Sequence, residues 1–270
     1  MSDRYFFDKV VLVTGASSGI GWATALALAP FRPRLVLAAR REKLLRELAV
    51  LIQDQCEVMI LPLDVSDVDQ DRKAIEQILQ RWGQIDILIN NAGMLAIARF
   101  HEQRISEIEK LLRVNYLGAA ALTHAVLPGM LKRNCGHIVN VSSIAGTTGF
   151  PYISAYCGSK FAMVGWTDAL RREYYGTGVT FTSFCPGTVD TPMIAVGMKN
   201  ERFRKVTRPR TPEQVAQRIL NCCRKRTREV IYGEVPSFVA KTARFFPAIV
   251  DWFFFQIYRR VHPLARQDQK

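Results

Sequence analysis

The sequence has 270 residues, 49% hydrophobic and 23% charged, an ordinary globular balance with enough apolar surface for one large domain or two small ones. The net charge is +13, and residues 199–270 alone carry 17 Lys and Arg against 6 Asp and Glu. Because no zinc-finger, RNP-type or basic-zipper signature accompanies this charge, we rank nucleic acid well below phospholipid as its partner. An ordinary solvated basic face remains the alternative.

Strand-like and helix-like segments alternate along the first part of the chain. Short apolar runs rich in β-branched residues predict buried parallel strands at 9–15, 34–40, 57–65 and 85–93. Segments with helical composition follow the first three of them, at 21–30, 41–55 and 67–83. This order of elements is typical of a parallel sheet covered by helices.

The alternation continues to residue 235. We expect helices around 104–131, 155–175 and 211–226, the last opened by Thr211 and Pro212, and strands at 137–143, 179–187 and 228–233; the segment 188–211 has no clear periodicity and reads as a mobile loop. The pattern predicts an α/β fold, a Rossmann-type doubly wound parallel sheet of about seven strands. Residues 1–235 then form a single catalytic domain that binds cofactor and substrate, and 236–270 a basic, aromatic-rich extension.

A glycine-rich loop, TGASSGIG (14–21), separates the first strand from the first helix. Gly15 permits a tight turn, Gly19 permits close approach of a pyrophosphate, and Gly21 permits close helix packing. The N-terminus of the following helix offers N–H groups and a positive dipole to phosphates. No Lys-Ser/Thr pair follows the last glycine, so this is not a Walker loop.

The second strand ends in Ala39, Arg40 and Arg41, where sites for a ribose 2′-hydroxyl carry an acidic residue. A guanidinium can instead bind a 2′-phosphate and stack on adenine. The sequence therefore favours NADP(H), with NAD(H) less favoured.

The segment SAYCGSK holds Tyr156 and Lys160 four residues apart, on one face of a helix. A nearby ammonium is expected to lower the pKa of the phenol and fit Tyr156 for proton transfer to a carbonyl oxygen. Ser143, at the end of the preceding strand, can hold the same oxygen.

These motifs together resemble the short-chain dehydrogenase/reductase family. TGASSGIG, NNAG, VNYLG, IVNVSS, YCGSK and CPGTVDTPM occur in family order over about residues 7–235. The resemblance implies that Ser143, Tyr156 and Lys160 form the catalytic triad and that Asn115 holds a water in a proton relay from Lys160 to solvent. It also implies a homodimer or homotetramer packed through the helices around 104–131 and 155–175. One departure is that Ser17 and Ser18 stand where some NADP-preferring members have a basic residue.

The implied cofactor contacts are distributed along the whole domain. They comprise Gly15, Ser17, Ser18, Gly19, Ile20, Gly21, Arg40, Arg41, Asp64, Val65, Asn91, Ala92, Gly93, Tyr156, Lys160, Pro186, Gly187, Val189 and Thr191. Asp64 and Val65 would flank the adenine, and the last four would contact the nicotinamide and its carboxamide.

The substrate pocket is implied to lie between the segment after Ser143, the loop 188–211 and the C-terminus. These segments supply Phe150, Tyr152 and Met193, with Ile194, Val196 and Met198, and show no paired arginines for a carboxylate. An apolar carbonyl or alcohol is therefore expected as substrate, of long-chain, steroid, retinoid or sphingoid type. The alternative is that these apolar residues only pack the loop against the domain and do not contact a substrate.

The segment FFPAIVDWFFFQIYRR (245–260) is too short to span a bilayer, which takes about 20 apolar residues. Its aromatic residues Trp252 and Tyr258 and the flanking Lys241, Arg244, Arg259 and Arg260 favour a peripheral membrane contact through 236–270. The alternatives are that this apolar segment packs against a neighbouring subunit or over the mouth of the substrate pocket.

The six cysteines form no CxxC, and the four histidines show no metal-ligand spacing. We therefore expect reduced thiols, no metal, and a cytoplasmic rather than secreted protein, since no signal peptide fits before the first strand. Two rival functions remain, an NAD-linked alcohol dehydrogenase and a non-catalytic protein that senses NADP(H) or scaffolds partners.

Overall fold

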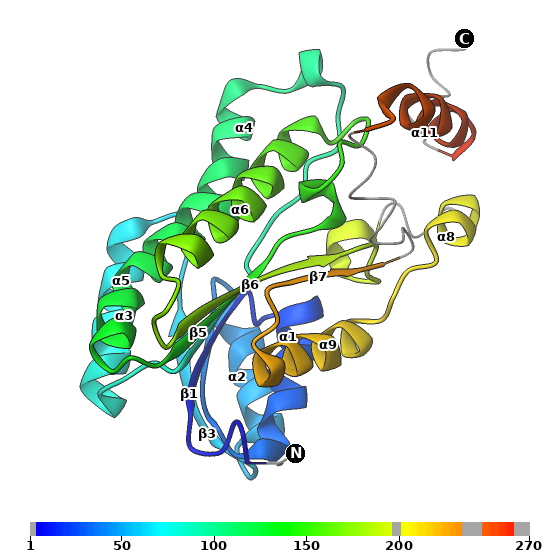
Figure 1. Ribbon diagram of the computed structural model, residues 1–270. Helices are drawn as coiled ribbons and strands as arrows, with labels where there is room; N and C mark the ends of the chain where they lie inside the picture. Colours follow the sequence, from blue (N-terminus) through cyan, green and yellow to red (C-terminus); the bar gives the residue numbers. More distant parts are fainter. Residues whose placement is uncertain (1–3, 196–200, 234–244, 262–270) are drawn as a thin grey trace.

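The computed structural model describes residues 4–195, 201–233 and 245–261. Its centre is a sheet of seven parallel strands in the order β3-β2-β1-β4-β5-β6-β7 (Figure 1). The strands are β1 (Val10–Thr14), β2 (Arg34–Ala39), β3 (Glu57–Pro62), β4 (Ile87–Asn90), β5 (Gly136–Val141), β6 (Val179–Pro186) and β7 (Glu229–Tyr232). This is the doubly wound, Rossmann-type sheet that the sequence predicted.

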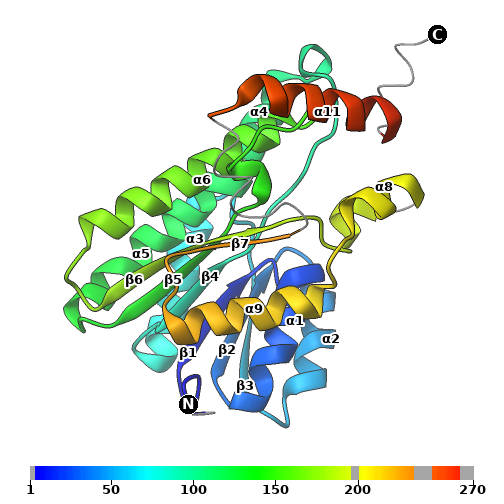
Figure 2. The same cartoon turned by 45° about the vertical axis from the view of Figure 1, so that its right-hand side comes forward.

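Helices cover both faces of this sheet (Figures 1 and 2). One face carries α1 (Gly19–Leu28), α2 (Glu42–Ile52) and α9 (Pro212–Lys225). The other carries α3 (Val68–Trp82), α4 (Ile105–Leu112), α5 (Gly118–Lys132) and α6 (Ser154–Glu173). The short helix α8 (Glu201–Thr207) precedes α9, and α11 (Pro247–Val261) lies at the end of the described chain.

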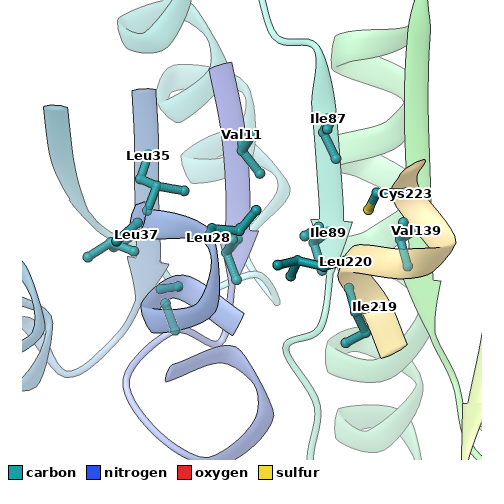
Figure 3. Packing of buried hydrophobic residues seen from close by; sticks show 14 of the residues in the cluster. Val11, Leu28, Leu35, Leu37, Ile87, Ile89, Val139, Ile219, Leu220 and Cys223 are labelled. Atoms are coloured by element: carbon teal, nitrogen blue, oxygen red, sulfur yellow. The ribbon is translucent and has the colours of Figure 1, made fainter. Parts of the chain in front are cut away.

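The central strands β1, β2 and β4 are mostly apolar because both of their faces are buried. Val11 of β1 lies in one cluster with Leu28 and Ile219 (Figure 3). Val13 belongs to the same cluster, and Leu12 between them belongs to the cluster on the opposite face. This double burial fixes the register of the sheet, since a shift of one residue would exchange the two sets of side chains.

Several helix ends follow signals that are visible in the sequence. Asp67 caps α3 by accepting from the N–H groups of Asp69 and Gln70, and Gly83 ends it at φ +73°. Thr211 opens α9 in a reciprocal capping box with Gln214. The expected boundaries of these two helices are therefore confirmed to within one residue.

The structure adds detail to two sequence predictions about local structure. The long helix expected around 104–131 is confirmed as the helical stretch Ile105–Lys132, and it contains a π-helical turn, η3 (Arg113–Leu117), between α4 and α5. The segment 188–211 is not all loop, because it contains the 3₁₀ turn η5 (Pro192–Ile194) and α8. The short, mostly polar α8 has no apolar stripe to detect; its Lys205–Glu201 ion pair, 2.8 Å, supports it locally.

Among the described residues, the helical stretch Ile105–Lys132 has the length and the apolar composition that a membrane-spanning helix needs. Its side chains Leu122, Val126 and Met130 lie in the core against β-strands and α3, which accounts for that composition within the fold. The residues Val196, Met198, Lys241 and Arg244, which carried part of the pocket and membrane predictions, lie outside the described residues, as do the side chains of Tyr258, Arg259 and Arg260.

Candidate active site

The strand order reverses between β1 and β4, since β2 and β3 lie on one side of this pair and β5 to β7 on the other. Ligands of open α/β sheets bind beyond the carboxyl ends of strands at such a reversal. The glycine-rich loop follows β1, Asn91 follows β4, Ser143 follows β5 and Gly187 follows β6. The fold therefore brings the motifs that are distant in sequence to one edge of the sheet.

The glycine-rich loop adopts a conformation that side chains would prevent. Gly15 and Gly19 have φ of +67° and +55°, values that favour glycine. A Cβ at Gly15 would lie 2.9 Å from Cα of Ala92, one at Gly19 would lie 2.9 Å from Cγ2 of Thr191, and one at Gly21 would collide with the carbonyl of Gly15. Because these positions carry no side chain, the backbone N–H groups at the N-terminus of α1 are accessible, as binding of a pyrophosphate requires.

Thr14, at the end of β1, joins this loop to the segment after β4. Its Oγ1 accepts hydrogen bonds from the backbone N–H groups of Asn91 (2.9 Å) and Ala92 (3.0 Å). The side chain of Asn91 donates back to the Thr14 carbonyl, 2.9 Å. Sequence reasoning missed Thr14; the detectable signal is a polar residue ending an otherwise apolar strand.

The two arginines after β2 occupy different positions. The guanidinium of Arg41 donates to Oγ of Ser17 (2.9 Å) and Oγ of Ser18 (2.7 Å), so it lies against the glycine-rich loop. Arg40 is largely exposed, with its guanidinium 3.8 Å from the carboxylate of Asp64. Arg41 thereby supplies the positive charge that the loop itself lacks. A guanidinium with two adjacent hydroxyls is a donor set that fits a 2′-phosphate.

Asp64 and Val65, expected beside the adenine, lie directly after β3. The Asp64 carboxylate accepts from the backbone N–H and the hydroxyl of Ser66, 3.0 and 2.8 Å. Val65 is buried, and its carbonyl lies so close to Gly118 that a Cβ there would collide with it. Gly118 therefore lets the start of α5 pack against this segment.

Tyr156 and Lys160 lie in the first turns of α6. Lys160 is buried, its Nζ donates to the carbonyl of Val141 at 3.0 Å, and it lies 5.8 Å from the centre of the Tyr156 ring. Oγ of Ser143 accepts from the N–H of Ala145 at 3.1 Å, and the Ser143 hydroxyl lies near enough to the Tyr156 phenol to favour its ionised form. The neighbouring Ser142 instead donates to the carbonyl of Lys160, 3.0 Å, and so ties β5 to α6. Ser143, and not Ser142, meets the phenol.

The pKa values of this pair differ from the sequence prediction. Burial raises the pKa of Tyr156 to about 12, and the Ser143 hydroxyl only partly opposes this. Burial also lowers the pKa of Lys160 to about 8. The expected lowering of the Tyr156 pKa is wrong because the cost of desolvating a phenolate outweighs the stabilising groups in this arrangement. Near neutral pH the phenol is protonated and the amine is mostly charged.

Asn115 lies in the π-helical turn and is fully buried. Its Oδ1 accepts from the N–H of Met94 (2.8 Å), and its Nδ2 donates to the carbonyl of Met94 (3.0 Å) and to Oγ of Ser159 (2.9 Å). Ser159 in turn donates to the carbonyl of Tyr156, 2.7 Å. The extra residue of the π turn thus directs an amide into the site, a common use of such turns. Ser159 was missed in the sequence because its motif marks only Tyr156 and Lys160.

A Cβ added to Gly93 would lie 3.4 Å from Oδ1 of Asn115 and 3.7 Å from Nζ of Lys160. Gly93 therefore lies beside both polar groups. Deeper in the fold, Nδ2 of Asn90 donates to Oδ1 of Asn140 and Nδ2 of Asn140 donates to Thr167, each at 2.8 Å. This buried chain attaches α6 to the centre of the sheet.

The segments expected to form the substrate pocket meet in part. The ring of Phe150 packs edge-on against Phe254 of α11, with 5.1 Å between centroids. Tyr152 has φ +66°, a strained value for a tyrosine, and its carbonyl accepts from Ala98 N–H at 2.9 Å. Met193, in η5, is 47% exposed.

The residues expected beside the nicotinamide follow β6. Pro186 ends that strand, and the N–H of Gly187 donates to the carbonyl of Tyr232 at 2.8 Å. Val189 is buried and pairs with Arg210, while Thr191 contacts the glycine-rich loop at Gly19. These contacts hold the segment beside the phosphate loop. Ile20, in the first turn of α1, is partly buried against the core.

A model of the family described as short chain dehydrogenase matches residues 9–202. The chain is 38% identical to an NADP-dependent 3-hydroxy acid dehydrogenase of Schizosaccharomyces pombe, over 83% of this chain and 90% of that protein. It is 33% identical to the mouse dehydrogenase/reductase SDR family member 7B, over 100% of this chain and 85% of that protein. Among solved structures, a short-chain dehydrogenase from Streptomyces avermitilis superposes with a TM-score of 0.77 at 28% identity, covering 94% of this chain and 98% of that one.

Proposed function

The chain belongs to the short-chain dehydrogenase family, and from this premise we propose that it is an NADP(H)-dependent oxidoreductase that reduces an apolar ketone or aldehyde to the alcohol. The observation that carries the proposal is the convergence of Ser143, Tyr156 and the buried Lys160 at the sheet edge that also holds the glycine-rich loop.

The reaction needs a hydride at carbon and a proton at oxygen. The reduced nicotinamide supplies the hydride when it is bound. Ser143 and Tyr156 hold the carbonyl oxygen by hydrogen bonds, and the phenol of Tyr156 gives that oxygen its proton as the C=O electron pair moves onto it. The charged amine of Lys160 stabilises the phenolate that remains, and Asn115 holds the relay that returns a proton to it.

Reduction is proposed because cells hold this cofactor mainly as NADPH, which favours hydride transfer to the carbonyl. A protonated Tyr156 phenol, with its pKa raised by burial to about 12, is in the form that this half of the reaction uses.

The preference for NADP(H) rests on Arg41. Its bonds to Ser17 and Ser18 bring a guanidinium and two hydroxyls together beyond the end of β2, a donor set that supports a 2′-phosphate as ligand. The Schizosaccharomyces pombe relative is also named as NADP-dependent. Arg40 is largely exposed and lies 3.8 Å from the Asp64 carboxylate.

An apolar substrate is supported by the aromatic pair Phe150–Phe254 and by the exposed, apolar Met193. Phe150 lies in the segment between Ser143 and Tyr156, and Met193 lies in the segment after β6. The Schizosaccharomyces pombe relative, by its name, acts on a 3-hydroxy acid. Substrates with and without a carboxylate therefore belong in the same test.

The experiment is to follow NADPH oxidation by the purified protein with long-chain ketones, steroid and retinoid carbonyls, and 3-keto acids, and to repeat it with NADH. We expect turnover of at least one apolar carbonyl, with NADPH preferred. Absence of turnover on every apolar carbonyl would contradict the substrate class, and equal use of NADH would contradict the role of Arg41.

A further inference from the structure

The C-terminal helix α11 and the residues just before it expose an unusual amount of apolar surface. Phe245 is 77% exposed, Ile249 65%, Trp252 64% and Phe255 60%. Positions 249, 252 and 255 recur every three residues, so their side chains share one side of the helix. A face of large aromatic and aliphatic side chains of this kind marks a surface that is covered in use.

The same helix is attached to the catalytic domain at its other side. Phe254 packs on Phe150, which lies in the segment between Ser143 and Tyr156. A helix of 15 residues is too short to cross a bilayer, for which about 20 are needed, so any lipid contact must be parallel to the membrane surface. In this orientation the segment that contains Phe150, between Ser143 and Tyr156, lies on the side of α11 that faces away from the membrane.

Further apolar side chains are exposed at the same end of the molecule. Phe100 is 63% and Ile105 68% exposed, in η2 (Phe100–Glu102) and at the start of α4. Both views place α11 and the start of α4 at the end to which the strands point, the end that holds the catalytic residues (Figures 1 and 2).

A basic groove of about 620 Å³ is lined by residues of α8, of the segment after it and of the start of α9. Figures 1 and 2 show α8 beyond the carboxyl ends of the strands. The lining of the groove includes the cations Arg204, Lys205, Arg208 and Arg210 and one acidic residue, Glu201. The Nε atom of Arg210 is buried and makes no hydrogen bond to any described residue. An excess of guanidinium groups over carboxylates in an open groove fits the phosphate of an anionic headgroup.

From these observations we propose that α11, the start of α4 and the basic groove form one docking surface for an anionic phospholipid bilayer. The apolar side chains enter the interface while the groove binds headgroup phosphates. The positive groove would repel a second copy of the chain and attract an anionic membrane, which decides between these two occupants. The inference rests on the proposed function in one respect, since a docked enzyme can take its apolar carbonyl directly from the lipid.

The test is co-sedimentation of the full chain with vesicles of phosphatidylcholine, with or without phosphatidylserine. Wild-type protein binds the vesicles that contain phosphatidylserine, and added salt weakens binding. The variant Ile249→Ser/Trp252→Ser/Phe255→Ser loses at least about tenfold in apparent affinity. So does Arg204→Gln/Lys205→Gln/Arg208→Gln, because it removes the headgroup contacts.

Matched controls come from α2 and α3, outside the proposed docking surface. Val50 and Leu51 at the end of α2 are 62% and 59% exposed, and Arg46 and Arg72 are similarly exposed cations. Val50→Ser/Leu51→Ser and Arg46→Gln/Arg72→Gln must bind vesicles like wild type. All variants should keep NADPH oxidation with a water-soluble ketone, which separates failure of docking from failure of the proposed function.

Two results would overturn the proposal. One is equal vesicle binding by wild type and both docking variants. The other is a stable dimer, seen by sedimentation velocity, that the α11 variant dissociates while no form binds vesicles; a second copy then covers this surface. Quenching of Trp252 fluorescence by brominated lipid, read as the difference from Trp252→Phe, provides a further measure, and its absence counts against lipid contact.

Discussion

The catalytic residues and the C-terminal surface lie at the same end of the sheet, yet they are built differently. Around Tyr156, the polar groups of Ser142, Asn115 and Ser159 are joined to backbone or side chains by short hydrogen bonds. At α11, Phe254 packs on Phe150, and the described side chains Ile249, Trp252 and Phe255 are exposed. A buried polar network fixes geometry, whereas an uncovered apolar face requires a partner. We therefore expect changes in the first region to alter chemistry and changes in the second to alter access.

The largest effect is expected at Tyr156. Replacement Tyr156→Phe removes the proton donor, and the rate of carbonyl reduction should fall by about 10² to 10⁴. The ring remains in place, so thermal unfolding should change little. Steady-state kinetics with NADPH and differential scanning calorimetry check both parts. An active Tyr156→Phe protein would exclude the acid role.

The next effect separates the two arginines after β2. Arg41→Ala should raise the KM for NADPH by roughly 10- to 100-fold, since bonds between a guanidinium and a phosphate are worth about 1.5–3 kcal/mol. Arg40→Ala, the matched control, should have a smaller effect, and the KM for NADH should change little in either variant. If both arginines contribute equally to NADPH binding, the assignment to Arg41 is wrong.

Asp71 is an exception within the otherwise well-bonded domain. It is buried, both carboxyl oxygens lack a hydrogen-bond partner among the described residues, and burial together with Asp67 and Asp64 raises its pKa to about 7. Because the folded-state pKa lies above the unfolded value of 3.8, the protein should lose stability as the pH rises from about 4 to about 7.

Asp71→Asn should remove this dependence and stabilise the protein at pH 8 by on the order of 1–3 kcal/mol, with little gain at pH 4. Urea unfolding at both pH values measures the difference. Asp69→Asn, in the same helical turn but hydrogen-bonded through its backbone to Asp67, is the control. An equal gain at both pH values would show that ionisation of Asp71 is not the cause.

The smallest effect distinguishes the two sides of α11. Phe254→Ala removes the contact with Phe150 and should lower kcat/KM for an apolar ketone about two- to tenfold, the range of a single aromatic pair. Phe255→Ala, on the exposed side, should leave this value unchanged when substrate is supplied in solution. Equal losses of kcat/KM in the two variants would show that the contact of Phe254 with Phe150 has no specific role in catalysis.

The sequence was sufficient where a local rule dictates the structure. The glycine-rich loop, the caps Asp67 and Thr211, and the spacing of Tyr156 and Lys160 all follow from short-range requirements. It was insufficient where distant segments meet. The π turn at Asn115, the ties through Thr14 and Ser159, and the bond from Arg41 to Ser17 depend on tertiary contacts that no periodicity encodes. The pKa of Tyr156 was misjudged for the same reason, because desolvation depends on what surrounds the ring.

The most direct test of the central claim is transfer of deuterium from NADPH labelled at nicotinamide C4 to an apolar ketone, read by mass spectrometry of the product. Both C4 stereoisomers of the label should be tried. With wild-type protein, we predict that the former carbonyl carbon acquires deuterium from one of them, and that Tyr156→Phe loses nearly all of this transfer. If no apolar carbonyl acquires the label from either isomer, although NADPH binds, the protein is not the reductase described above.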